Sequence, residues 1–108
     1  KSVMKEKTVQ ELKQMIDDGV DFQLIDVREP HEYEACNINA LLIPLGTIVT
    51  EFDQIEKEKP VIIHCRSGAR SAAAINELEK RFQLTNLYNL KGGIMEYARE
   101  IDDTLQPF

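Results

Sequence analysis

The sequence is poor in cysteine, with only Cys36 and Cys65 among 108 residues. Two cysteines are too few for the disulfide framework of a small secreted domain, and these two are not spaced as metal ligands. We therefore expect free thiols in a reducing, cytoplasmic compartment, with a single bond between the two cysteines as the alternative. The sequence predicts neither a metal nor a cofactor.

Long hydrophobic runs, repeats and low-complexity tracts are also missing. No apolar stretch approaches the length needed to span a bilayer, and the first residues lack the pattern of a signal peptide. We therefore expect no membrane association and one domain covering residues 1–108. The chain begins with Lys1 rather than methionine, which suggests a processed product or part of a longer polypeptide.

The chain has fewer positively charged residues than acidic ones. Thirteen lysines and arginines face nineteen acidic residues, for a net charge of −6. A nucleic-acid-binding surface needs a basic face, so nucleic-acid binding is not expected. Against this acidic background Arg66 and Arg70 form a local positive site that could attract a small anion.

Short apolar segments alternate with helical patterns along the chain. A capping box at Thr8 and Glu11 predicts the start of a helix that ends near Gly19. We expect strands at 23–27, 41–43, 61–64 and 87–90, and further helices at 30–35, 47–57, 70–82 and 94–101. This alternation predicts an α/β fold in three layers, with a mainly parallel sheet covered by helices on both faces.

The segment that follows the strand at 61–64 carries most of the chemical information. It consists of Cys65, Arg66, Ser67, Gly68, Ala69, Arg70 and Ser71. A strand that enters a tight loop and then a helix gathers backbone N–H groups around one point. A cysteine at the start of that loop, with two arginines nearby, is expected to ionise readily and act as a nucleophile.

The simpler interpretation of Cys65 is an inert core residue, because free cysteine is among the most buried residue types. The polar and cationic residues that surround it in the sequence argue against that interpretation. Gly68 permits a positive φ in the turn, and the two serines could donate to an anion or hold the loop, with Ser71 also a candidate helix cap.

Three segments together resemble the rhodanese-like sulfurtransferases. They are the Asp-Val-Arg segment within residues 24–33, the loop at 65–71 and the double glycine within 90–94. The resemblance implies a persulfide carried on Cys65. The sulfur would come from thiosulfate or a persulfide-bearing protein and pass to a nucleophilic acceptor. It also implies that Asp26 and Arg28 are structural, in ion pairs behind the sheet.

The sequence departs from the family in two places. Residues 36–40 replace the usual Gly-His-Ile-Pro-Gly turn, so we expect a differently shaped turn there. Ile94 and Tyr97 stand where the family has aromatic residues, often tryptophan, and these changes bear on substrate entry more than on chemistry. Tyr97 itself is interpreted as a residue of the core or its rim.

A mechanism follows from the loop. The Cys65 thiolate would attack the outer sulfur of a donor, and the loop amides would stabilise the resulting persulfide as an oxyanion hole stabilises oxygen. Arg66 and Arg70 would help to bind an anionic donor, with Arg70 also bracing the loop. His64 should point away from Cys65, because neighbouring residues on a strand face opposite sides. Cys36 is interpreted as a small apolar filler, with resolution of the persulfide as its alternative role.

Other functions compete with the simple sulfurtransferase. The end of the chain resembles rhodanese domains fused behind adenylyltransferases, whose acceptor would be a ubiquitin-like sulfur carrier in molybdopterin or thiamine synthesis. A non-catalytic binding or regulatory module is a second possibility. A cysteine phosphatase or arsenate reductase is a third, although phosphatase loops carry one more residue between the cysteine and the arginine.

Overall fold

Five parallel strands form the centre of the computed structural model, which describes residues 3–107. The strand order is β1-β5-β4-β2-β3. The strands are β1 (Glu6–Lys7), β2 (Gln23–Asp26), β3 (Leu41–Leu42), β4 (Val61–His64) and β5 (Leu87–Leu90). β4 lies in the middle and is buried along its whole length, so the segment that follows it emerges at the centre of the carboxyl edge of the sheet.

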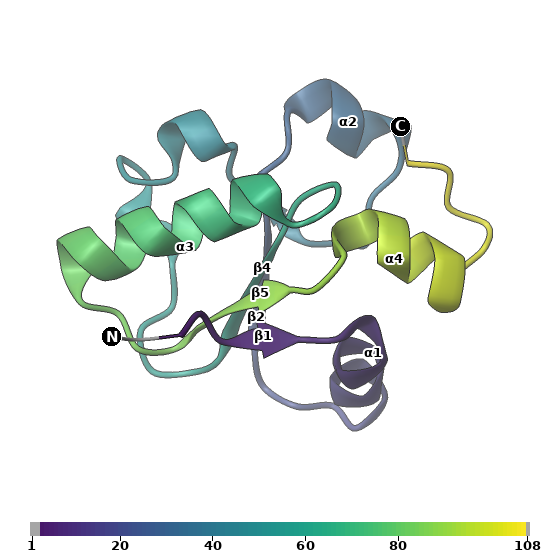
Figure 1. Ribbon diagram of the computed structural model, residues 1–108, viewed down its shortest axis with the longest axis horizontal. Helices are drawn as coiled ribbons and strands as arrows, with labels where there is room; N and C mark the ends of the chain where they lie inside the picture. Colours follow the sequence, from purple (N-terminus) through teal and green to yellow (C-terminus); the bar gives the residue numbers. More distant parts are fainter. Residues whose placement is uncertain (1–2, 108) are drawn as a thin grey trace.

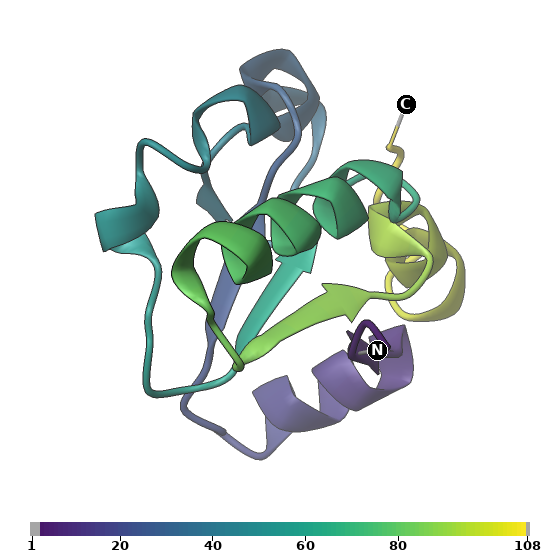
Figure 2. The ribbon, with the colours of Figure 1, turned by 60° about the vertical axis from the view of Figure 1, so that its left-hand side comes forward.

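Helices cover both faces of this sheet, as Figures 1 and 2 show, and the predicted α/β class is confirmed. On one face, α3 (Ala69–Phe82) and the 3-10 helices η1 (Leu45–Thr47) and η2 (Phe52–Gln54) enclose the larger apolar core. On the other face, α1 (Val9–Asp17) packs beside α4 (Gly93–Glu100) over a smaller core. The short helix α2 (Pro30–Ala35) lies beside the start of α3.

Local sequence signals place several of these boundaries. Thr8 caps α1, and the capping box with Glu11 forms as predicted, since each side chain accepts a hydrogen bond from the other residue's backbone N–H. Gly19 follows the helix with a φ of +66°, a conformation that glycine adopts without strain. Pro30 occupies the first turn of α2, where its missing N–H costs no helical hydrogen bond.

The predicted helix at 47–57 is wrong. η1 ends at Thr47, and after a turn the chain forms η2. The β-branched run Thr47–Thr50 disfavours an α-helix, and the hydroxyls of its two threonines donate to nearby backbone carbonyls. Ile48 and Ile55 are nevertheless buried, as the pattern of apolar residues predicted.

The structure also contains a strand that the sequence did not predict and a turn whose altered shape it did predict. The sequence analysis missed β1, which pairs with β5 at the edge of the sheet. The altered turn at residues 36–40 contains Asn39 with a φ of +64°, and the Asn37 side chain accepts a hydrogen bond from the Asn39 N–H. Asparagine tolerates this backbone conformation better than most residues, so the turn forms without the family's proline and glycine.

Among residues 3–107, none of the helices combines the length and apolar character needed to cross a bilayer. Lys1, on which the expectation of a longer polypeptide depends, lies outside the described residues.

Candidate active site

The loop after β4 has the geometry that its sequence predicts. Cys65 follows the last residue of the strand, and α3 begins at Ala69 after a turn at Gly68. Gly68 has a φ of +119°, which confirms the expected use of glycine at this position. Gly68, rather than Ser71, is the residue that precedes the helix, so the Ser71 side chain is free for another role.

The sulfur of Cys65 lies at the entrance to α3. It accepts hydrogen bonds from the Gly68 N–H at 3.1 Å and the Ser71 N–H at 3.4 Å, and the Ser71 hydroxyl also lies 3.4 Å away. The residue is only 1% exposed and borders the larger apolar core, so the sulfur is shielded from water. Polar donors nevertheless surround the sulfur on its loop side, unlike an inert core cysteine.

These surroundings lower the pKa of Cys65. Burial is the largest influence and raises the pKa, because it disfavours the charged thiolate. Hydrogen bonds from the Ser71 hydroxyl and from the amides of Ser71, Gly68 and Ser67 together outweigh burial. The arrangement can therefore hold a sulfur anion, which is the nucleophilic form of cysteine.

Replacing Ser71 with alanine is expected to raise the pKa of Cys65, because the serine hydroxyl is the strongest of the influences that lower it. The shift should appear as a higher midpoint in the pH dependence of iodoacetamide alkylation. Ser67→Ala is the matched control, since Ser67 is exposed and its side chain makes no hydrogen bond among the described residues. An unchanged midpoint in Ser71→Ala would contradict the assigned role of the hydroxyl.

A second helix fixes the loop from behind. The Ile94 N–H at the start of α4 donates to the Cys65 carbonyl, and the Met95 N–H donates to the Arg66 carbonyl, both at 3.0 Å. Gly93 makes this approach possible. A Cβ atom at Gly93 would lie 2.4 Å from the Arg66 carbonyl oxygen. With these two carbonyls bound to α4, the loop is held in the conformation that directs its amides toward the sulfur.

Asn89 on β5 is a supporting residue that the sequence analysis missed. Its side-chain oxygen lies 2.6 Å from the Ser71 hydroxyl and is a second acceptor, beside the Cys65 sulfur, for the single proton of that hydroxyl. Its side-chain nitrogen donates to the Gly68 carbonyl at 3.2 Å. Asn89 is only 5% exposed. The available signal was an asparagine within an apolar strand, because a buried polar side chain needs hydrogen-bond partners.

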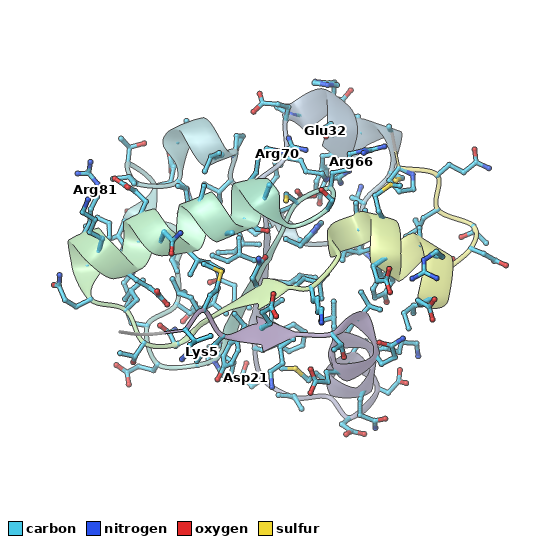
Figure 3. The ribbon with its side chains drawn as sticks, in the orientation of Figure 1. Lys5, Asp21, Glu32, Arg66, Arg70 and Arg81 are labelled. Atoms are coloured by element: carbon cyan, nitrogen blue, oxygen red, sulfur yellow. The ribbon has the colours of Figure 1, made fainter. Side chains whose placement is uncertain are left out.

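The two loop arginines have different surroundings, although Figure 3 shows both in the upper part of the view, near Glu32. Arg70 donates from Nη1 and Nη2 to the two carboxylate oxygens of Glu32 in α2, at 2.6 and 2.9 Å. Arg66 is exposed and makes no ion pair among the residues that the structure describes. Only one of the two predicted anion-binding side chains is therefore uncompensated, and the sequence analysis did not predict Glu32 as the partner of Arg70.

The Arg70 side chain lowers the pKa of Glu32 from 4.5 to about 2, mainly through its hydrogen bonds. A carboxylate with a lowered pKa stabilises the fold fully above pH 4.5, and that stabilisation is lost as the pH falls toward 2. As the pH falls from 4.5 toward 2, we therefore expect the free energy of unfolding to decrease less in Glu32→Gln than in the unmodified protein. Chemical denaturation at a series of pH values measures the difference, and identical pH profiles would contradict it.

Asp26 and Arg28 pair with each other. The guanidinium of Arg28 donates to both oxygens of the Asp26 carboxylate at 2.8–3.1 Å, and both side chains are buried. His64 lies on the same side, with Nε2 at 3.5 Å from an Asp26 oxygen, and burial lowers its pKa. Along the chain these three side chains alternate with Val27 and Cys65. Val27 and Cys65 belong to the larger apolar core, on the opposite face of the sheet. The His64 ring therefore points away from the Cys65 sulfur, as predicted, although its Nδ1 lies 3.3 Å from the Cys65 carbonyl oxygen.

The remaining residues of interest lie outside this constellation or at its surface. Ser67 and Ala69 are exposed at the mouth of the loop. Ile94 and Tyr97 are buried, so neither lines an entrance, and Tyr97 belongs to the smaller core. Cys36 and Cys65 are both free thiols.

Comparison with known sequences gives a consistent picture. The sequence pattern of the rhodanese-like domain family matches residues 8–100 of this chain. The chain is 41% identical over 80 residues to the uncharacterized protein YqhL of Bacillus subtilis, covering 73% of this chain and 63% of that protein. It is 38% identical over 89 residues to a sulfurtransferase of Allochromatium vinosum, covering 82% of each.

Two larger relatives match over only part of their length. A probable adenylyltransferase/sulfurtransferase of Mycobacterium tuberculosis, MoeZ, is 31% identical over 97 residues, which cover 87% of this chain and 24% of the relative. A tRNA uridine(34) hydroxylase of Yersinia pestis is 35% identical over 98 residues, covering 83% of this chain and 27% of the relative. The same domain thus occurs in proteins that are named for different activities. The reaction of this chain therefore has to be inferred from the residues of its own site.

Solved structures agree with the sequence comparison. The crystal structure of a rhodanese-like domain protein from Staphylococcus aureus superimposes with a TM-score of 0.80 at 33% identity. The superposition covers 87% of this chain and 91% of that chain.

Proposed function

Because the chain belongs to the rhodanese-like domain family, we propose that it is a sulfurtransferase that carries sulfane sulfur as a persulfide on Cys65. The single observation that carries the proposal is the set of hydrogen bonds to the Cys65 sulfur at the entrance to α3. They favour the thiolate, and they would equally stabilise negative charge on a second sulfur atom.

In the first half-reaction the thiolate attacks the outer sulfur of a donor. With thiosulfate, a bond forms between the Cys65 sulfur and the outer sulfur, the S–S bond of thiosulfate breaks, and sulfite leaves with the electron pair. With the persulfide of a thiol, the leaving group is the thiolate. In the second half-reaction a nucleophile attacks the terminal sulfur, takes it, and regenerates the Cys65 thiolate. No general base is required when the Cys65 thiol is ionised, the form that the lowered pKa favours.

The experiment is intact-mass analysis of the protein after incubation with a sulfur donor. We expect the mass of one added sulfur atom, removed by cyanide with formation of thiocyanate. A protein that gains no sulfur from thiosulfate or from a persulfide would end the proposal and favour a non-catalytic module. Faster hydrolysis of an aryl phosphate than sulfur transfer would favour a phosphatase, and arsenate reduction would favour an arsenate reductase.

A narrower role has separate support. MoeZ combines adenylyltransferase and sulfurtransferase in its name, and this chain aligns with about a quarter of its length. We therefore propose, as the specific acceptor, the adenylated C-terminus of a ubiquitin-like sulfur carrier of the kind used in molybdopterin or thiamine synthesis. The test incubates the persulfidated protein with such a carrier and a dithiol reductant. Mass analysis should detect a thiocarboxylate on the carrier, and its absence would rule out this acceptor.

A further inference from the structure

Arg70 already binds an anion that the chain itself supplies. Its two terminal nitrogens donate to the two oxygens of Glu32, the parallel two-bond geometry by which arginine would otherwise bind an oxyanion of a sulfur donor. The Glu32 side chain is 11% exposed and that of Arg70 is 33% exposed, so solvent weakens this pair less than it weakens a surface pair. A donor that reaches the loop therefore meets an arginine whose charge is largely balanced.

Glu32 is held in this position by its own helix. Its side chain also accepts a hydrogen bond from the Glu29 N–H at 2.9 Å, which completes a capping box at the start of α2. The pKa of Glu32 is lowered to about 2 by Arg70, so the carboxylate stays charged at any pH at which the protein would work. The balance of charge at Arg70 is therefore a permanent property of the folded chain.

Few other positive charges near Arg70 would attract an anionic donor. Arg66 is the one uncompensated loop arginine, and the helix that supplies Glu32 also carries Glu34, which is exposed. The whole chain has a net charge of −6. Thiosulfate carries two negative charges. The persulfide of a thiol carries at most one near its outer sulfur, so it pays a smaller electrostatic penalty at this loop.

We propose that Glu32 is a specificity-determining residue that withholds Arg70 from the sulfur donor and so favours thiol persulfides over thiosulfate. This inference rests on the proposed function. In the favoured reaction the Cys65 thiolate attacks the outer sulfur of R–S–S⁻, a new S–S bond forms at Cys65, and R–S⁻ leaves. The charge of the reactants and products is the same, and no external oxidant or reductant takes part.

The test compares two donors, thiosulfate and cysteine persulfide, in single-turnover persulfidation of Cys65 followed by intact mass. Glu32→Gln keeps a side-chain oxygen for the Glu29 N–H but removes the charge that balances Arg70. We expect this variant to react about tenfold faster with subsaturating thiosulfate, through a lower half-saturating concentration, and within about twofold of the original rate with cysteine persulfide.

Two further variants tie the effect to the ion pair. Glu34→Gln removes an exposed charge from the same helix and should change neither rate by more than about twofold. Adding Arg70→Gln to Glu32→Gln should abolish the gain with thiosulfate, because the released arginine is then missing.

The outcomes separate this inference from the proposed function. An equal loss of rate with both donors in Glu32→Gln would mean that Glu32 only braces the loop, and would overturn the inference. So would unchanged rates, or an equal gain in Glu34→Gln. If the unmodified protein gains no sulfur from either donor, the proposed function itself fails, whatever the variants do.

Discussion

Replacement of Cys65 by serine is expected to abolish sulfur uptake, with a fall in rate of at least about a thousandfold. The loop amides can lower the pKa of a thiol to the point where it ionises, but a serine hydroxyl starts from a far higher pKa and stays protonated. Serine also has no sulfur from which a persulfide could extend. Intact mass after exposure to thiosulfate or cysteine persulfide measures the loss directly.

The other cysteine provides the matched control. Cys36 is free and partly exposed, and it makes no contribution to the hydrogen bonds around the Cys65 sulfur. Cys36→Ser should therefore gain one sulfur at close to the original rate. Persistent uptake by Cys65→Ser would refute the assignment of the nucleophile. Slower release of sulfur in Cys36→Ser would instead support the alternative in which Cys36 resolves the persulfide.

Replacement of Gly93 by alanine is expected to have the second largest effect. The new Cβ would lie 2.4 Å from the Arg66 carbonyl oxygen and 2.6 Å from that of Cys65, and the backbone there has a φ of +62°. The nearest atoms all belong to the backbone of Cys65 and Arg66, so no flexible side chain can move aside and α4 and the loop must separate. We expect a loss of at least about 3 kcal/mol in the free energy of unfolding.

Thermal unfolding checks this result, and a loss of 3 kcal/mol corresponds to a fall in Tm of about 12 °C or more for a domain of this size. Gly46→Ala is the control, because a Cβ at Gly46 would meet no atom within 4 Å. That variant should unfold within a few degrees of the original protein. A Gly93→Ala variant with unchanged stability and unchanged alkylation of Cys65 would show that α4 does not hold the loop.

The parts of the fold that could be predicted are those with local signals. The buried strand β4, the glycine turn after it and the capping box of α1 each depend on a few consecutive residues. β1 could not be predicted, because it is two residues long, Glu6 and Lys7 are charged, and it exists only through pairing with β5. The predicted helix at 47–57, after Pro44, was wrong for the opposite reason. Its apolar spacing is helical, but its β-branched run disfavours a continuous α-helix, and the chain forms two short 3-10 helices separated by a turn.

The candidate site divides in the same way. Cys65 and the amides around it come from one continuous segment, so the sequence was enough to propose them. Asn89 and Glu32 reach the loop from β5 and α2, and no local pattern indicates which distant residue will meet Ser71 or Arg70. Arg70 shows the consequence most clearly, because an arginine that looked available for a donor is already paired within the fold.

The hydrogen bonds from α4 to the carbonyls of Cys65 and Arg66 also have a bearing on biosynthesis. A ribosome releases the cysteine well before it releases the helix that orients the surrounding amides. While the loop is not held by α4, we expect the cysteine to behave more like an ordinary thiol, which is mostly protonated and slow to react with oxidants or electrophiles. We therefore expect full reactivity of the cysteine to develop once α4 has been synthesised and its N–H groups have bound the two carbonyls.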